Sequence, residues 1–155
     1  MTVTNEALAQ LIEERAIERV LDRWSIAMDR NDWDGVEACL AAQFTLLAPP
    51  VVTYADPKPR AQAIREIAAR NSKVGGFHCM PGKSITIDGD RAHAITRLIG
   101  GHWSSDKTNW EMAYGFYEVD LVREAESWRI AKLSVQTLFS QGTGLFEKMA
   151  ESGEK

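Results

Sequence analysis

The chain has 155 residues, of which 45% are hydrophobic and 26% are charged, which is typical of one soluble globular domain rather than a disordered chain. Its formal net charge of -4, with scattered basic residues, argues against nucleic-acid binding, because phosphate recognition needs clustered Lys and Arg. No apolar stretch reaches the ~18 residues that span a membrane, and residues 1–5 do not resemble a signal peptide. We therefore expect a cytoplasmic protein that binds neither nucleic acid nor membranes.

The first third of the chain predicts a long helix. Thr4 or Asn5 can cap a helix that runs to about Arg30. Its later apolar residues recur at helical spacing and predict one core-facing side, made of Ile17, Val20, Leu21, Trp24 and Met28.

Asp29, near the end of this helix, lies off the apolar stripe. The periodicity alone therefore places it in solvent. Its position is also electrostatically poor, because a helix C-terminus carries partial negative charge, although the neighbouring Arg30 can offset this.

Shorter elements follow the long helix. Asn31 or Asp32 can cap a helix from Trp33 to about Ala42, and residues 44–47 read as a strand that residues 51–54 resume after two prolines. Residues 56–59 read as a loop. A third helix is predicted from Ala61 to about Asn71, and the glycine pair 75–76 ends that segment.

From His78 onward the pattern changes to strands. They are predicted at residues 78–88, 92–103, 110–123 and 128–140, and a terminal helical turn follows at residues 145–150. Helices followed by a run of antiparallel strands predict an α+β domain with the helices packed on one face of a curved sheet.

Strand alternation predicts which side chains face the helices. In the strand 92–103, His102 shares a face with small and apolar residues, whereas His93 lies on the opposite face. In the next strand Tyr117 lies on the small-residue face and Trp110 on the other. Both faces are partly apolar, so we expect the outer one to contact a partner subunit in a homo-oligomer.

The two cysteines, Cys39 and Cys79, form neither a CxxC pair nor a zinc spacing. They are expected to be free thiols that pack as small apolar side chains. The histidines and carboxylates also lack metal-ligand spacing, and no glycine-rich phosphate loop occurs, so we expect neither a metal nor a cofactor.

The order of three segments resembles a known family. These are residues 28–34 (MDRNDWD), the strand that starts at His78 and includes residues 85–88 (ITID), and the closing strand with Trp128. From about Leu8 to Gly142 the chain is similar to the SnoaL-like branch of the nuclear-transport-factor-2-like superfamily, which includes scytalone dehydratases, bile-acid 7α-dehydratases and hexachlorocyclohexane dehydrochlorinases. The resemblance implies a cone-shaped (cystatin-like) α+β fold, and we expect a single domain over residues 1–155 with residues 143–155 as a C-terminal tail.

The resemblance implies roles for three residues. Asp29 matches the aspartate of an Asp–His dyad, His78 its general base, and His102 a second active-site histidine. It therefore places Asp29 inside the cone, against the helical periodicity. General-base catalysis of this kind contributes about 10²–10⁴-fold, and His102 could protonate a leaving hydroxyl or stabilise an enolate.

The chain also departs from these enzymes. Two water-holding tyrosines of scytalone dehydratase become Met28 and Ala48, and two small polar residues on a central strand become Gly115 and Tyr117. The active-site lysine of the dehydrochlorinase becomes Trp24. The proton-transfer residues are kept, and the residues that read the substrate differ.

A cofactor-free lyase, similar to a dehydratase, is the function that this combination favours. The expected substrate is small, hydrophobic and ring-containing, and the expected reaction is proton abstraction followed by elimination or C–C cleavage. Tyr117 could supply a hydrogen bond to an oxyanion. The side chains expected to line the substrate site, each of which could instead be ordinary packing, are Trp24, Met28, Tyr54, Trp103, Trp110 and Tyr117.

Other functions stay open. An isomerase or cyclase would return the proton elsewhere on the substrate, and a non-catalytic module would only bind a small molecule. Epoxide hydrolysis would need a water-holding Asp, Asn and Arg set that the sequence does not supply convincingly. The resemblance favours a trimer over a dimer, with residues 139–145 helping to close a pocket, and residues 49–59 are a candidate lid.

Overall fold

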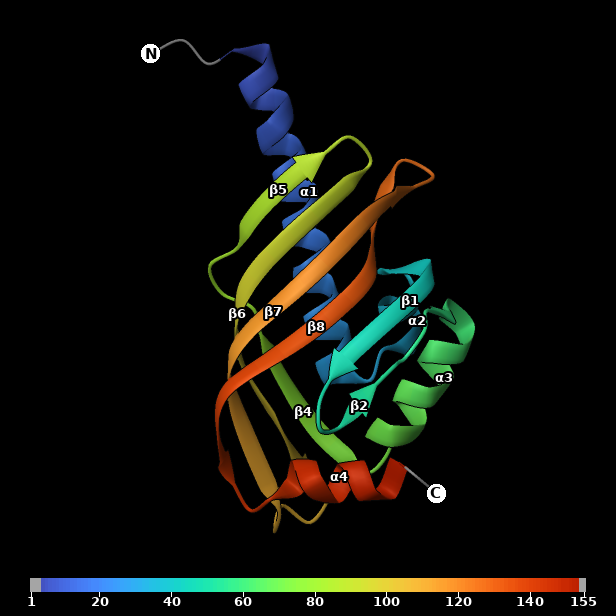
Figure 1. Cartoon of the computed structure of the whole chain (residues 1–155), viewed down its shortest axis with the longest axis vertical. Coiled ribbons are helices and arrows are strands. Elements are labelled where there is room, and N and C mark those ends of the chain that lie inside the picture. Colours follow the sequence, from blue (N-terminus) through green and yellow to red (C-terminus); the bar gives the residue numbers. More distant parts are fainter. Residues whose placement is uncertain (1–3, 154–155) are drawn as a thin grey trace.

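The computed structural model describes residues 4–153 as helices packed against one long, curved sheet (Figure 1). The helices are α1 (Asn5–Arg30), α2 (Trp33–Glu37), α3 (Arg60–Asn71) and α4 (Leu145–Gly153). The strands are β1 (Leu40–Ala48), β2 (Val52–Thr53), β3 (Lys58–Pro59), β4 (Val74–Cys79), β5 (Ser84–Asp88), β6 (Arg91–Ser104), β7 (Trp110–Glu124) and β8 (Ser127–Gly142).

The sheet is mixed. Its strand order is β2-β1-β8-β7-β6-β4, with β3 paired to β1 and β5 paired to β6. Among the pairings within residues 4–153, only that between β1 and β8 is parallel. Helices on one face of a mixed, curved sheet confirm the predicted α+β class. No helix in the described part of the chain is long and apolar enough to cross a membrane.

The predicted long helix α1 is confirmed almost to the residue. The Thr4 hydroxyl accepts a hydrogen bond from the Ala7 amide at its start (3.2 Å). At its end Asn31 adopts a left-handed conformation (φ 53°), which turns the chain sharply after Asp29 and Arg30. The last turns of α1 therefore lie against strand β4, with which α1 packs.

Two predicted element boundaries after α1 were wrong. The helix expected to reach Ala42 ends at Glu37, because the Cys39 carbonyl already accepts from the Ile130 amide (2.8 Å) and so joins the sheet. Residues 58–59, expected in a loop, pair with β1 as strand β3.

The segment expected as one strand, residues 78–88, is two strands. Both β4 and β5 pair with β6, but at different places along it, so the chain must break between them. Gly75 and Gly76, expected to end the preceding segment, lie inside β4. Gly75 has a packing role, because a Cβ there would lie 2.2 Å from the indole nitrogen of Trp103.

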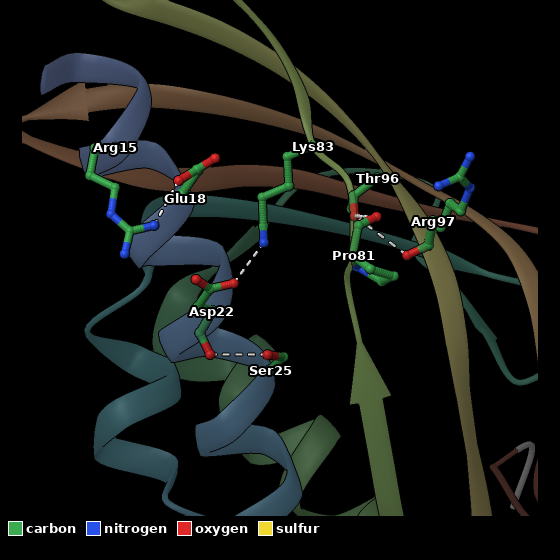
Figure 2. A network of polar contacts seen from close by, with 8 residues as sticks. All are labelled: Arg15, Glu18, Asp22, Ser25, Pro81, Lys83, Thr96 and Arg97. Carbon is green, nitrogen blue, oxygen red and sulfur yellow. Dashed lines mark hydrogen bonds and ion pairs between the residues drawn. The ribbon is translucent and has the colours of Figure 1, made fainter. Parts of the chain in front are cut away.

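Polar contacts hold the β4–β5 connection in place (Figure 2). Lys83 in this connection donates to the Asp22 carboxylate of α1 (2.7 Å). On the other side the Pro81 carbonyl accepts from the Thr96 hydroxyl of β6 (3.1 Å). The connection is thus tied to both the helix and the sheet, which fixes the end of β4 just after His78.

The predicted alternation of β6 and β7 is confirmed. Residues on the inner face are buried against the helices, among them Ala94 and Leu98 of β6 and Tyr117 and Val119 of β7. The outer face leaves large apolar side chains in solvent, namely Phe77, Ile95, Ile99 and Trp110.

Candidate active site

A cavity of about 110 Å³ opens between the helices and the inner face of the sheet. Side chains from α1, α3 and α4 and from strands β1, β4, β6, β7 and β8 contribute to its lining. Most of the lining is apolar. The polar side chains that the site can use for chemistry or recognition include Trp24, Arg70, Asn71, His78, His102 and Tyr117.

Asp29 and His78 are in direct contact. The Nδ1 atom of His78 lies 2.7 Å from Oδ1 of Asp29, and the backbone N–H of His78 donates to Oδ2 of the same carboxylate (3.1 Å). An ionised carboxylate can only accept, so this contact assigns the ring proton to Nδ1. His78 lines the cavity, and its Nε2 atom is left as the free basic nitrogen.

The sheet edge explains why Asp29 lies here. Strand β4 ends the sheet, so its backbone is paired only on the β6 side. The N–H of His78 on the free side needs an acceptor, and Asp29 on the last turn of α1 supplies one. Helical periodicity reports only burial in the core, and it therefore misplaced this residue in solvent.

His102 lines the same cavity but has a different protonation state from the one expected. Its ring stands edge-on to His78, with centroids 5.4 Å apart, and Nδ1 lies 3.3 Å from the Gly75 carbonyl. Desolvation, followed by the charge of nearby His78, lowers the pKa of His102 to about 4. The imidazole is therefore neutral near pH 7. Donation from Nδ1–H to Gly75 would leave Nε2 an acceptor, so the structure argues against His102 as proton donor to a leaving group.

Tyr117 is the better donor. Its side chain is buried and lines the cavity. Burial, and then the negative charge of Asp29, raise the pKa of Tyr117 well above its usual value. The phenol therefore keeps its proton and can donate a hydrogen bond to an oxyanion.

Two other expected substrate contacts, Trp24 and Met28, also line the cavity. The Trp24 ring stands edge-on to both His78 and Tyr117, with centroids 5.6 Å and 6.4 Å away. Its Nε1–H is buried and has no hydrogen-bond partner among the described residues. An unpaired buried donor in a cavity wall is available to a ligand.

Three aromatic residues expected in the wall do not line the cavity. Tyr54 is buried beside α3, where the Lys58 ammonium lies 4.1 Å from its ring centroid. Trp103 lies across Gly75, and Trp110 is on the outer face with 43% of its surface exposed. The prediction assigned these residues to the cavity wall because they are aromatic. For Trp110 the strand alternation had already indicated the outer face of the sheet.

Sequence reasoning missed Arg70 and Asn71, which end α3 and line the cavity. A signal was present, because Arg70 follows the buried Ile67 by three residues and so lies near the same side of the helix. Pro49 from the candidate lid segment is also in the lining, together with Val51.

Helix α4 contributes Phe146 and Met149 to the lining. Figure 1 shows α4 (red) lying across the lower end of the sheet, near the start of β4. The buried Glu111 of β7 holds it there, because its carboxylate accepts from the Phe146 amide (2.9 Å) and from the Ser140 hydroxyl (3.0 Å). The Phe146 ring then stands edge-on to His102. Within the single chain α4 thus lines the cavity, and the pocket-closing role expected of residues 139–145 in a trimer stays a prediction.

Among residues 4–153, no group of three or more His, Cys, Asp and Glu side chains is arranged to hold a metal ion. Cys39 and Cys79 are both free thiols.

Comparisons with known proteins place the chain in a family. No curated protein matches the sequence. Among solved structures, the Kfla4162 protein from Kribbella flavida is similar with a TM-score of 0.76 and 20% identity, over 92% of this chain and 99% of that one. A candidate scytalone dehydratase from Novosphingobium aromaticivorans gives a TM-score of 0.74 and 18% identity, over 85% and 88% of the two chains. The hexachlorocyclohexane dehydrochlorinase LinA-type3 from Novosphingobium barchaimii gives 0.71 and 12%, over 88% and 93%.

At these identities the likeness to solved structures shows the fold alone. The family itself follows from the sequence, because the profile of the SnoaL-like domain matches residues 9–134, which is most of the chain. The protein is a member of the SnoaL-like domain family.

Proposed function

We propose that this protein is a cofactor-free lyase that eliminates water, or a comparable leaving group, from a small ring-containing substrate. The observation that carries the proposal is the Asp29–His78 contact beside the cavity. A carboxylate that fixes one ring nitrogen leaves the other free to accept a proton and stabilises the imidazolium that forms. The fold similarity to a candidate dehydratase and to a dehydrochlorinase agrees with this chemistry.

The proposed reaction balances within the site. For a β-hydroxy ketone, Nε2 of His78 takes the proton from the carbon next to the carbonyl, and the C–H electron pair forms an enolate. The enolate oxygen accepts a hydrogen bond from the Tyr117 hydroxyl. The enolate then expels the hydroxyl group, the proton on Nε2 passes to it, and water leaves. His78 is then neutral again. Throughout the reaction His102 stays neutral and orients the leaving hydroxyl group, which donates a hydrogen bond to its Nε2.

The size and lining of the cavity support a single-ring substrate. Its volume of about 110 Å³ is comparable with the roughly 150 Å³ of an engineered apolar cavity that binds benzene. Trp24 and Phe146 provide aromatic surfaces beside the two histidines.

An isomerase is the second candidate. The free Nε2 of His78 could take a proton from one carbon of the substrate and return it to another. A non-catalytic binding module is less well supported, because it has no need to hold a carboxylate against a partly buried imidazole, where desolvation is costly.

A deuterium experiment tests the proposal and separates its variants. The protein is incubated with cyclic β-hydroxy ketones in D₂O and followed by ¹H NMR. Loss of water with a new vinyl signal supports the lyase, and a shifted double bond without loss of water supports the isomerase. Absence of both reactions and of deuterium incorporation, across a panel of such compounds, would leave only the binding module.

We also propose that the protein is a homo-oligomer, with a trimer expected. Large apolar side chains lie exposed on the outer face of the sheet and on the last part of β8, including Trp110 (43%), Leu138 (65%) and Phe139 (58%). Sedimentation equilibrium measures the mass directly. A monomer at micromolar concentration would refute this proposal without affecting the catalytic one.

A further inference from the structure

Arg70 is the only Lys or Arg residue, among the described part of the chain, that lines the cavity. It lies in the last turn of α3, and its Nε atom is buried without a hydrogen-bond partner. A basic residue in the last turn can be explained by the helix dipole, but that explanation does not require a buried, unpaired N–H in a cavity wall.

The neighbouring acidic group is already occupied. Glu66, one turn earlier on α3, accepts from Lys58 on β3 and from Gln62 (2.9 Å). No carboxylate within residues 4–153 forms an ion pair with Arg70. The Tyr54 hydroxyl lies within hydrogen-bonding reach of the Arg70 guanidinium, but it is no counter-ion, because burial and then Glu66 raise the pKa of Tyr54 to about 12 and keep the phenol neutral. The guanidinium of Arg70 therefore has a neutral hydroxyl as a neighbour but no ion-pair partner among residues 4–153.

A second unpaired donor lies elsewhere in the lining. The two lining residues with a buried, unpartnered polar atom are Trp24 and Arg70, and in both the atom is an N–H donor. A ligand that satisfies them must bring acceptors. Asn71, next to Arg70 in the lining, adds an amide group that can donate as well.

We propose that Arg70 binds a carboxylate on the substrate, so that the protein acts on ring-containing carboxylic acids rather than on neutral ring compounds. A carboxylate has only acceptors, and its plane matches the guanidinium, which can donate to both of its oxygens. A phosphate group is a poorer match, because its second charge would have no further Lys or Arg in the lining to meet it. The inference rests on the proposed function only in treating the bound carboxylic acid as a substrate, because Arg70 would bind the carboxylate whether or not a reaction follows.

The test compares benzoate with benzamide, which has nearly the same shape but no charge. Isothermal titration calorimetry measures the binding of each probe to the whole chain, without turnover. We expect benzoate to bind about tenfold more tightly than benzamide, and inorganic phosphate to bind more weakly than benzoate. Arg70→Met should abolish the preference, and Arg70→Lys should keep part of it.

Arg65→Met is the matched control, because Arg65 is an exposed arginine on the same helix, outside the lining. It should keep the benzoate preference. Equal binding of the two probes to the wild type, no benzoate binding at millimolar concentration, or a preference that survives in Arg70→Met would each overturn the inference. Thermal unfolding of Arg70→Met confirms that the variant is folded.

His78→Gln separates this inference from the proposed function. It should keep the benzoate preference while losing elimination. A benzoate preference in a protein that eliminates nothing would support the carboxylate site and refute only the lyase.

Discussion

Two Asp–His pairs in this molecule have the same contact distance but differ in burial, because one lies beside the cavity and the other on the outer face of the sheet. Asp29–His78 and Asp120–His93 each join a carboxylate Oδ1 to an imidazole Nδ1 at 2.7 Å. The side chains of the first pair are 23% and 11% exposed, and those of the second are 49% and 44% exposed.

The comparison shows that the contact alone does not make a catalytic pair. On the outer face, the side chains of His93 and Asp120 are half-exposed, so solvent screens their interaction. At the cavity, His78 stands beside Trp24 and His102, where the dielectric is lower and a bound substrate can approach the free nitrogen. The outer pair therefore supplies a matched control for each experiment on the inner pair.

Removing the base should have the largest effect. His78→Gln is expected to lower the elimination rate by about 10⁴-fold, the upper end for general-base catalysis. The variant lacks the imidazole that Asp29 orients, and with it the free nitrogen that accepts the proton. The rate is measured by ¹H NMR on a substrate found in the deuterium screen. His93→Gln should keep the wild-type rate, and an equal loss in both variants would mean that the inner pair has no special role.

Removing the charge of the carboxylate should have the next largest effect. Asp29→Asn is expected to cost about 10³-fold, because the amide no longer fixes the Nδ1–H tautomer or stabilises the imidazolium. The ¹⁵N chemical shifts of the His78 ring report the tautomer directly. Asp120→Asn should change neither the rate nor these shifts, whereas unchanged His78 shifts in Asp29→Asn would contradict the assigned tautomer.

The pair also shows what the sequence could and could not predict. Strand alternation predicted the inner position of Tyr117 and His102 and the outer position of His93, because successive side chains of a strand point to opposite faces of the sheet. Asp29 could be placed only through the family resemblance, since its position depends on a backbone N–H at the sheet edge that no side-chain period reports. Arg70 was missed because it is brought to the cavity by the packing of α3, and pattern reasoning assigns a charged residue to solvent.

Tyr117 further characterises the surroundings of the inner pair, because it is buried and lines the same cavity as His78. Tyr117→Phe removes the hydroxyl and keeps most of the packing, and we expect a loss of about 10²-fold in rate. The loss should appear in kcat rather than KM, because the hydrogen bond strengthens as the enolate forms. An unchanged kcat would remove Tyr117 from the mechanism without affecting the Asp29–His78 assignment.

The smallest effect on catalysis is expected at His102, whose role shows instead in stability. At neutral pH His102→Gln should lower the rate by less than about tenfold, because a neutral imidazole only orients the substrate. Its pKa is lowered from 6.5 to about 4 in the folded protein. Between these values the unfolded chain binds a proton that the folded protein does not, so stability is present above pH 6.5 and falls as the pH drops toward 4.

For the wild type, this single group should remove on the order of 2 kcal/mol of unfolding free energy between pH 7 and pH 4.5. Urea unfolding at the two pH values measures the loss, and His102→Gln should show a smaller one than either the wild type or His93→Gln. His93→Gln controls for removal of an imidazole as such. If His102→Gln loses as much stability in acid as His93→Gln does, His102 is protonated in the folded protein, and its place in the mechanism becomes that of a proton donor.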